Sequence, residues 1–188
     1  MILTDIEILK QMDSLHQSII IEPFDPECLG TNSYDVHLGK YLAFYTASTI
    51  DAAVDNKTEE FEIPEDGYVL DPNKIYLGVT LEYTETHKHV PFLEGKSSVG
   101  RLGIDIHATA GKGDVGFCGH WTLEISCKQP VRIYAGMPIG QLIFFEVSGK
   151  IKNPYNKKAD AKYNNHDPHP QASRMWMNNF FQNKTTPK

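Results

Sequence analysis

The chain has 188 residues, of which 40% are hydrophobic and 22% are charged, and its net charge is −6. The length predicts a single domain, and the composition excludes a disordered, collagen-like or coiled-coil protein. Apolar runs are too short to span a membrane and the N-terminus does not resemble a secretory leader, so we expect a cytoplasmic protein. Three cysteines without CxxC spacing predict neither a disulfide framework nor a zinc site.

Charge is divided unevenly along the chain. Residues 148–188 carry eight Lys and Arg against two acids, whereas residues 1–147 have a net charge of −12. Because long nucleic acids require a broad basic face, we expect no nucleic-acid partner. A small anion held by a few cations of the tail is compatible with this balance, and so is a solvated tail that binds nothing.

A short helix and then many strands are predicted from the N-terminus onward. Thr4 and Glu7 have the spacing of a capping box, and apolar residues then recur at helical spacing through Leu15, so this segment predicts a helix. Residues 51–60 and 149–170 are polar and predict a loop and a C-terminal arm. Short β-rich runs predict an all-β barrel or sandwich, and they comprise residues 19–21, 34–38, 41–45, 61–63, 68–70, 75–83, 104–108, 121–127, 131–134 and 139–147.

Residues 94–103, Glu-Gly-Lys-Ser-Ser-Val-Gly-Arg-Leu-Gly, concentrate groups that bind an oxyanion. Lys96, Ser97, Ser98 and Arg101 fall within six positions bracketed by glycines. Hydroxyls, backbone amides and a guanidinium all donate to phosphate oxygens, although the segment does not match a Walker loop. Ser and Gly are also common in surface hairpins, so the spacing by itself leaves both interpretations open.

Two further segments carry candidate side chains. In the glycine-dense turn at 108–119, the Asp114 carboxylate could bind a sugar hydroxyl while the Phe117 ring packs on the sugar, or Asp114 could cap its own backbone. Polar and apolar residues then alternate over 121–127, as in a strand with two different faces. Glu124 lies in the middle of this strand, where it is either a general base in a dry site or an outward surface residue.

Taken together, the motifs resemble the dCTP deaminase and dUTPase superfamily, and more closely its dCTP deaminase branch. The resemblance covers almost the whole chain and rests on residues 1–5 (MILTD), 33–38 (SYDVHL), 93–103 (LEGKSSVGRLG), 107–111 (HATAG), 114–119 (DVGFCG), 122–124 (TLE), 136–144 (GMPIGQLIF), 154–155 (PY), 161–163 (AKY) and 173–174 (SR). It implies one domain over residues 1–188, folded as a distorted all-β barrel with residues 148–188 as a C-terminal arm or lid. It also implies a homotrimer with active sites between neighbouring chains.

The reaction that this resemblance implies is hydrolysis of the 4-amino group of dCTP to give dUTP and ammonia, with Mg²⁺ bound to the triphosphate. Glu124 would be the general base and proton shuttle, and Ser97 and Arg101 would complete the catalytic group. Nucleobase deaminases that use zinc carry HxE followed by PCxxC, and this sequence has neither, so we expect no zinc and no metal held by protein side chains. Feedback in the family suggests dTTP as an inhibitor.

The resemblance also implies the residues that bind the substrate. The triphosphate positions are Lys96, Ser98, Arg101, Tyr155 and Lys162. Asp114 would hold the 3′-hydroxyl, Phe117 would exclude a 2′-hydroxyl, and Gln141 and Thr122 would line the nucleoside pocket.

Two positions depart from the family pattern. His166 stands where the family usually has Gln, and we expect it to donate to a phosphate oxygen. Residues 113–116 read Gly-Asp-Val-Gly where the usual turn is Ile-Asp-Pro-Gly, which should loosen the turn around Asp114.

Other interpretations stay open at the level of sequence. Some family members with Gly at the Gly111 position also cleave the triphosphate, so a bifunctional enzyme that forms dUMP and pyrophosphate is one alternative. A nucleotide-binding regulator without turnover is a second. His87 and His89 could share a metal, but no third ligand is nearby in the sequence, so we interpret them as surface histidines.

Overall fold

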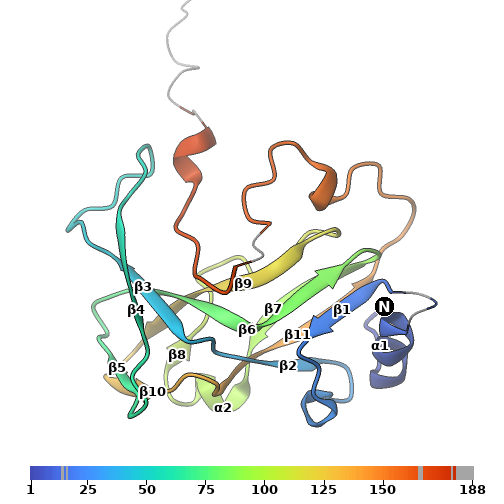
Figure 1. Cartoon of the computed structure of the whole chain (residues 1–188), viewed down its shortest axis with the longest axis horizontal. Helices are drawn as coiled ribbons and strands as arrows, with labels where there is room; N and C mark the ends of the chain where they lie inside the picture. The colour runs from blue at the N-terminus through green and yellow to red at the C-terminus, as the bar shows by residue number, and fades with distance from the viewer. Residues whose placement is uncertain (14, 16, 165–166, 179, 181–188) are drawn as a thin grey trace, which may run out of the picture.

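The computed structural model describes residues 1–13, 15, 17–164, 167–178 and 180, and over these residues the protein is mostly β with a few short helices (Figure 1). The strands are β1 (Ile19–Glu22), β2 (Tyr34–His37), β3 (Tyr41–Tyr45), β4 (Thr58–Glu62), β5 (Tyr68–Leu70), β6 (Tyr76–Thr86), β7 (His89–Gly95), β8 (Ile104–Asp105), β9 (Cys118–Cys127), β10 (Val131–Ile133) and β11 (Pro138–Glu146). The helices are α1 (Asp5–Met12), α2 (Ser97–Gly100), η1 (Pro26–Cys28), η2 (Tyr155–Lys157) and η3 (Met175–Asn178). Within the described residues, no helix is long and apolar enough to cross a membrane.

Helix α1 begins where the capping box predicts. The Thr4 hydroxyl accepts a hydrogen bond from the Glu7 amide at 3.4 Å, and Ile8 is fully buried against the strands. The helix ends at Met12 rather than continuing to Leu15, which is exposed. The predicted apolar face therefore contributes less to the core than its periodicity indicates.

Antiparallel pairing organises the strands into three sheets. The largest has the order β4-β3-β6-β9-β8, with β1 paired to β6, and a second sheet has the order β2-β11-β7. Strands β10 and β5 form a short ribbon. Side chains from the two larger sheets meet in one hydrophobic core, which includes the fully buried residues Tyr34, Val36, Leu123, Ile125, Leu142 and Phe144.

The structure differs from the sequence-based expectation in several segments. Residues 58–60, predicted as the end of the loop at 51–60, belong to strand β4 because they pair with β3. Residues 89–95 form strand β7, although Pro91 and the charged ends of this segment gave no strand signal. The strand forms because it pairs along its whole length with β11, from Gly140 opposite Gly95 to Glu146 opposite His89. The following residues form the one-turn helix α2 instead of a surface hairpin.

Strand β9 has one face in the core and one face that is partly open to solvent. Its odd-numbered residues Trp121, Leu123 and Ile125 are buried in the core, and the even-numbered residues between them are half-buried. This alternation matches the predicted two-faced strand. The C-terminal arm lies beyond β9 on one side of the sheets, whereas α2 lies on the opposite side (Figure 1).

Candidate active site

The outward face of β9 lines a cavity of about 350 Å³. His120, Thr122 and Glu124 contribute to it from alternate positions of the strand, together with Leu77 on the neighbouring strand β6. This volume falls in the range of small-molecule sites. The sequence-predicted residues Phe117, Thr122, Glu124 and Tyr155 all line this one cavity.

The C-terminal arm covers the cavity and is tied to the strands below it. The Gln171 amide donates to the Thr122 hydroxyl on β9 at 3.0 Å, and the Ser173 amide donates to the Tyr45 hydroxyl on β3 at 3.0 Å. Within the arm, the Tyr155 hydroxyl accepts from the amides of residues 162 and 163 at 3.1 and 2.9 Å. The arm therefore forms a wall of the cavity by contacts through its backbone.

Glu124 presents a carboxylate to this space. Its Oε2 accepts a hydrogen bond from the Ala108 amide at 3.2 Å. An ionised carboxylate can accept several hydrogen bonds, so this single contact fixes the group while leaving acceptor positions for water in the cavity. The geometry fits the role of a general base that the sequence predicts.

Aromatic rings and a glycine turn form the wall opposite. The Phe117 ring packs against Trp121 at a centroid distance of 4.7 Å and against Tyr155 at 6.3 Å. The Tyr155 amide donates to the Val115 carbonyl at 2.8 Å. Gly116 has a φ of +91°, and a Cβ there would lie 2.7 Å from the Tyr155 nitrogen, so only glycine lets the arm approach this turn.

Cations surround Asp114 at the edge of the cavity. Lys112 Nζ lies 2.6 Å from its Oδ1 and Lys158 Nζ lies 3.3 Å from its Oδ2. The hydrogen bond from Lys112, followed by the charge of Lys112 and the contact with Lys158, lowers the pKa of the Asp114 carboxyl below its ordinary value. Asp114 is therefore held as an anion between two lysines, beside the place where the sequence predicts the sugar.

His120 is a cavity residue to which the sequence analysis gave no role. Its Nδ1 donates to the Thr80 carbonyl at 3.1 Å, and burial lowers the pKa of its imidazole. Burial therefore favours the neutral form of this ring. Its position four residues before Glu124 on the same face could have been found from the alternation of β9 alone.

The remaining arm residues pack on one another. Arg174 donates to the Lys162 carbonyl and, at 2.8 Å, to the Gln171 side chain. Lys162 Nζ donates to the Asn178 side chain. Tyr163 and Ser173, which belong to two of the family motifs, also line the cavity, as do Tyr45 and Gln171, which no sequence motif singles out. His166 lies outside the described residues.

The second predicted group lies apart from the cavity. Lys96, Ser97, Ser98 and Arg101 belong to α2 and its flanks, on the side of the sheets opposite the arm (Figure 1). Gln141 is on β11, where its side chain accepts a hydrogen bond from Ser33 at 3.2 Å.

The side chains of this second group are either exposed to solvent or bonded to residues outside the cavity. Lys96 is paired with Asp35, whereas Ser97, Ser98 and Arg101 are exposed. Within one chain, the structure brings together Glu124 and the aromatic residues, but it does not bring Ser97 and Arg101 to them.

The family model described as dCTP deaminase-like matches residues 2–147. The chain belongs to this dCTP deaminase-like family. The "dCTP deaminase, dUMP-forming" of Clostridium acetobutylicum is 52% identical over 153 residues, which cover 81% of this chain and 86% of that protein. Proteins of the same description from Cytophaga hutchinsonii and Leptospira biflexa are 48% and 47% identical, over 81% and 86% of this chain and 87% and 91% of their own lengths.

A solved structure shows the same fold. The crystal structure of 2′-deoxycytidine 5′-triphosphate deaminase from Agrobacterium tumefaciens aligns over 76% of this chain with a TM-score of 0.60 and 23% identity. The present chain spans about half of that one, at 47%. The family indicated by the sequence motifs is therefore confirmed, as is the expectation of an enzyme of the hydrolase class.

Proposed function

We propose that the protein is a bifunctional dCTP deaminase that converts dCTP to dUMP, ammonia and pyrophosphate. The names of the three relatives above, all dUMP-forming, support this alternative better than the enzyme that stops at dUTP, which the sequence analysis put first. The observation that carries the proposal is the Glu124 carboxylate on the wall of an arm-covered cavity.

In the deamination step, Glu124 takes a proton from the water that attacks C4 of the cytosine ring. It then passes that proton to the 4-amino nitrogen, which leaves as ammonia. The second proton of the water moves from the new C4 hydroxyl to N3, so the ring becomes uracil. The Ala108 amide at 3.2 Å holds the carboxylate in place for both transfers. The cycle consumes one water and returns Glu124 to its ionised state.

The other cavity residues suit a pyrimidine nucleotide. The rings of Phe117 and Tyr155 provide apolar surface for the nucleoside, and Lys112 and Lys158 provide positive charge beside Asp114 at the edge of the cavity. Mg²⁺ would arrive with the triphosphate, because phosphate oxygens and water are its preferred ligands.

The family resemblance links a glycine at the Gly111 position to the dUMP-forming reaction, and a side chain does not fit at this position. A Cβ at this position would lie 2.5 Å from the Leu93 carbonyl oxygen, which is part of the backbone of β7. The Leu93 amide in turn donates to the Gly111 carbonyl at 2.7 Å. Any larger residue would shift this loop, which leads into the cavity at Ala110 and Lys112.

The separation of the two residue groups is accounted for if neighbouring copies share each site. We infer a homotrimer of distorted barrels in which α2 of one copy brings Ser97 and Arg101 to the cavity of the next copy. Contacts between different surfaces of identical chains close into a ring when the rotation between copies is one third of a turn. The exposed donors on α2 support this arrangement, since they lie outside the cavity of their own chain.

Product analysis tests the proposed reaction. The purified protein is incubated with dCTP and Mg²⁺, and the nucleotides are separated by chromatography, with Glu124→Gln as the control. We expect dUMP and pyrophosphate in equal amounts from the wild type and neither from the variant. Accumulation of dUTP would contradict the second step, and unchanged dCTP would contradict the deamination.

A further inference from the structure

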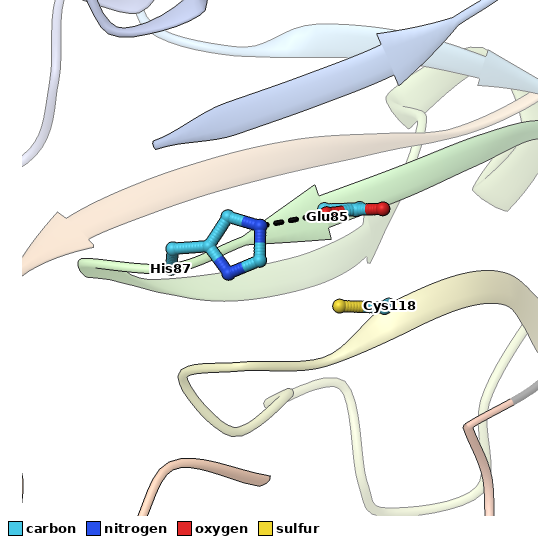
Figure 2. Close-up of side chains that lie close together, drawn as sticks. All are labelled: Glu85, His87 and Cys118. Carbon is cyan, nitrogen blue, oxygen red and sulfur yellow. Dashed lines mark hydrogen bonds and ion pairs between the residues drawn. The ribbon is translucent and has the colours of Figure 1, made fainter. Parts of the chain in front are cut away.

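A second cluster of reactive side chains lies outside the cavity lining. Glu85 and Cys118 are direct partners across strands β6 and β9, and His87 follows Glu85 by two residues (Figure 2). Side chains directly opposite each other on paired strands lie on the same face. The strand register therefore brings one oxygen, one nitrogen and one sulfur donor together, all within 4.8 Å of one another.

This combination of donor atoms favours zinc over Mg²⁺ and Ca²⁺. Carboxylate, imidazole and thiolate are the three groups with which proteins bind zinc, whereas Mg²⁺ and Ca²⁺ take oxygen ligands. Three protein ligands leave a fourth position of a tetrahedral ion for water. Co²⁺ occupies such sites with the same ligands and is the spectroscopic substitute for Zn²⁺.

The surroundings orient these donors. The Tyr83 hydroxyl donates to Glu85 Oε1 at 2.7 Å, and Glu85 Oε2 lies 2.6 Å from His87 Nε2. A hydrogen bond to the remaining carboxylate oxygen is the usual outer contact of a metal-binding carboxylate. The side chains of His87 and Glu85 are 33% and 22% exposed, so an ion can reach them from solvent.

We propose that Glu85, His87 and Cys118 bind a zinc ion, or another late first-row divalent cation, with one position open to water. Tetrahedral ligation separates the donor atoms by about 3.3–3.7 Å, so the Glu85–His87 pair opens slightly as the ion enters. The ion displaces the thiol proton and the proton shared by His87 and Glu85, and these protons go to solvent.

The free thiol is held in its protonated form. Burial, followed by the charge of Glu85, raises the pKa of Cys118 to about 11. Metal binding must therefore displace a proton that solvent alone does not remove at neutral pH.

This site is independent of the proposed deamination. Cys118 is six residues from Glu124 on β9, which corresponds to roughly 20 Å along an extended strand. The prediction that Glu124 acts without zinc is unaffected, whereas the proposed site departs from the expectation that no protein side chain holds a metal. Sequence reasoning missed the site because it paired His87 with His89 and looked for the third ligand only nearby in the chain. His89, expected at the surface, is buried on β7.

An ion at this place would restrain the turn that carries Phe117. This residue directly precedes Cys118, and its carbonyl accepts from the Thr86 amide at 3.1 Å, next to Glu85. The ion would therefore join β6 and β9 beside a ring that lines the cavity.

Cobalt titration tests the proposal. Protein freed of metal with a chelator is titrated with Co²⁺, and thiolate-to-cobalt charge transfer is followed in the near ultraviolet. Zn²⁺ affinity is measured by competition with a chromophoric chelator. We expect one ion per chain, loss of the charge-transfer band in Cys118→Ser, and at least about tenfold weaker Zn²⁺ binding in His87→Gln.

Cys127→Ser is the matched control, because Cys127 is a buried cysteine at the other end of the same strand. This variant should keep the band. Absence of the band in the wild type, or its persistence in Cys118→Ser, would overturn the proposal. If Cys118→Ser does not fold, unchanged Zn²⁺ affinity of His87→Gln would overturn it.

Discussion

The two regions that carry the predicted catalytic residues are built in opposite ways. Around Glu124, the strand face is covered by the arm, and backbone amides from the arm donate to Thr122 and Tyr45. Around α2, the donor side chains of Ser97 and Arg101 are exposed on a single helical turn. One region is a pocket that does not contain Ser97 or Arg101, and the other is a set of exposed donors outside that pocket. This difference is the basis of the proposal that each region is half of a site shared between copies.

Replacing the proposed general base, Glu124, should have the largest effect on activity. Glu124→Gln keeps the shape of the side chain but removes the proton acceptor, so turnover of dCTP should fall by about 10³-fold. Binding of dCTP, measured by calorimetry, should change only a few-fold. Turnover like that of the wild type would remove Glu124 from the mechanism and, with it, the cavity from the active site.

Loosening the arm should have a smaller effect. In Gly116→Ala, the Cβ meets the Tyr155 amide, and an alanine also strains a turn with a φ of +91°. The arm should lift, the KM for dCTP should rise by about tenfold, and limited proteolysis should cut the arm faster.

Gly149→Ala is the matched control for this change, because Gly149 has a φ of +87° but, among the described residues beyond its chain neighbours, no atom lies within 4 Å of the added Cβ. It carries the same backbone strain without the clash. Equal KM values for the two alanine variants would show that the contact between Gly116 and Tyr155 does not hold the arm over the substrate.

The charge cluster at the edge of the cavity gives the smallest predicted effect, which is a shift in titration. The pKa of Asp114 is lowered, so its pairing with Lys112 stabilises the fold above the ordinary Asp value of about 4, and this stabilisation is lost as the pH falls through the lower folded pKa. In Lys112→Met, the pKa of Asp114 should rise toward the ordinary value. NMR titration of the carboxyl measures it, and an unchanged pKa would contradict the assigned cause.

Local patterns predicted the elements whose signals are local. The capping box placed the start of α1 at Thr4, and the alternation around Glu124 predicted a two-faced strand that the structure confirms. Strand β7 was not predicted, because Pro91 disfavours a strand and the pairing with β11 that stabilises it joins segments far apart in the chain.

The candidate site was predictable only in part. Motif order identified Glu124, Phe117 and Tyr155, which the cavity brings together. The contacts of Gln171 with Thr122 and of Ser173 with Tyr45 join segments far apart in the chain, and spacing carries no information about them. The position of α2 on the far side of the sheets likewise follows from tertiary packing rather than from its sequence.

Mixing two inactive variants tests most directly whether the two regions form one shared site. Glu124→Gln removes the proposed base from the cavity, and Arg101→Ala removes a donor beside α2. Each variant alone should therefore be nearly inactive. If α2 of one copy completes the cavity of the next, trimers reassembled from an equal mixture should recover about one quarter of wild-type activity, since one site in four then combines two intact halves. Activity no greater than the sum of the two variants alone would contradict the shared site.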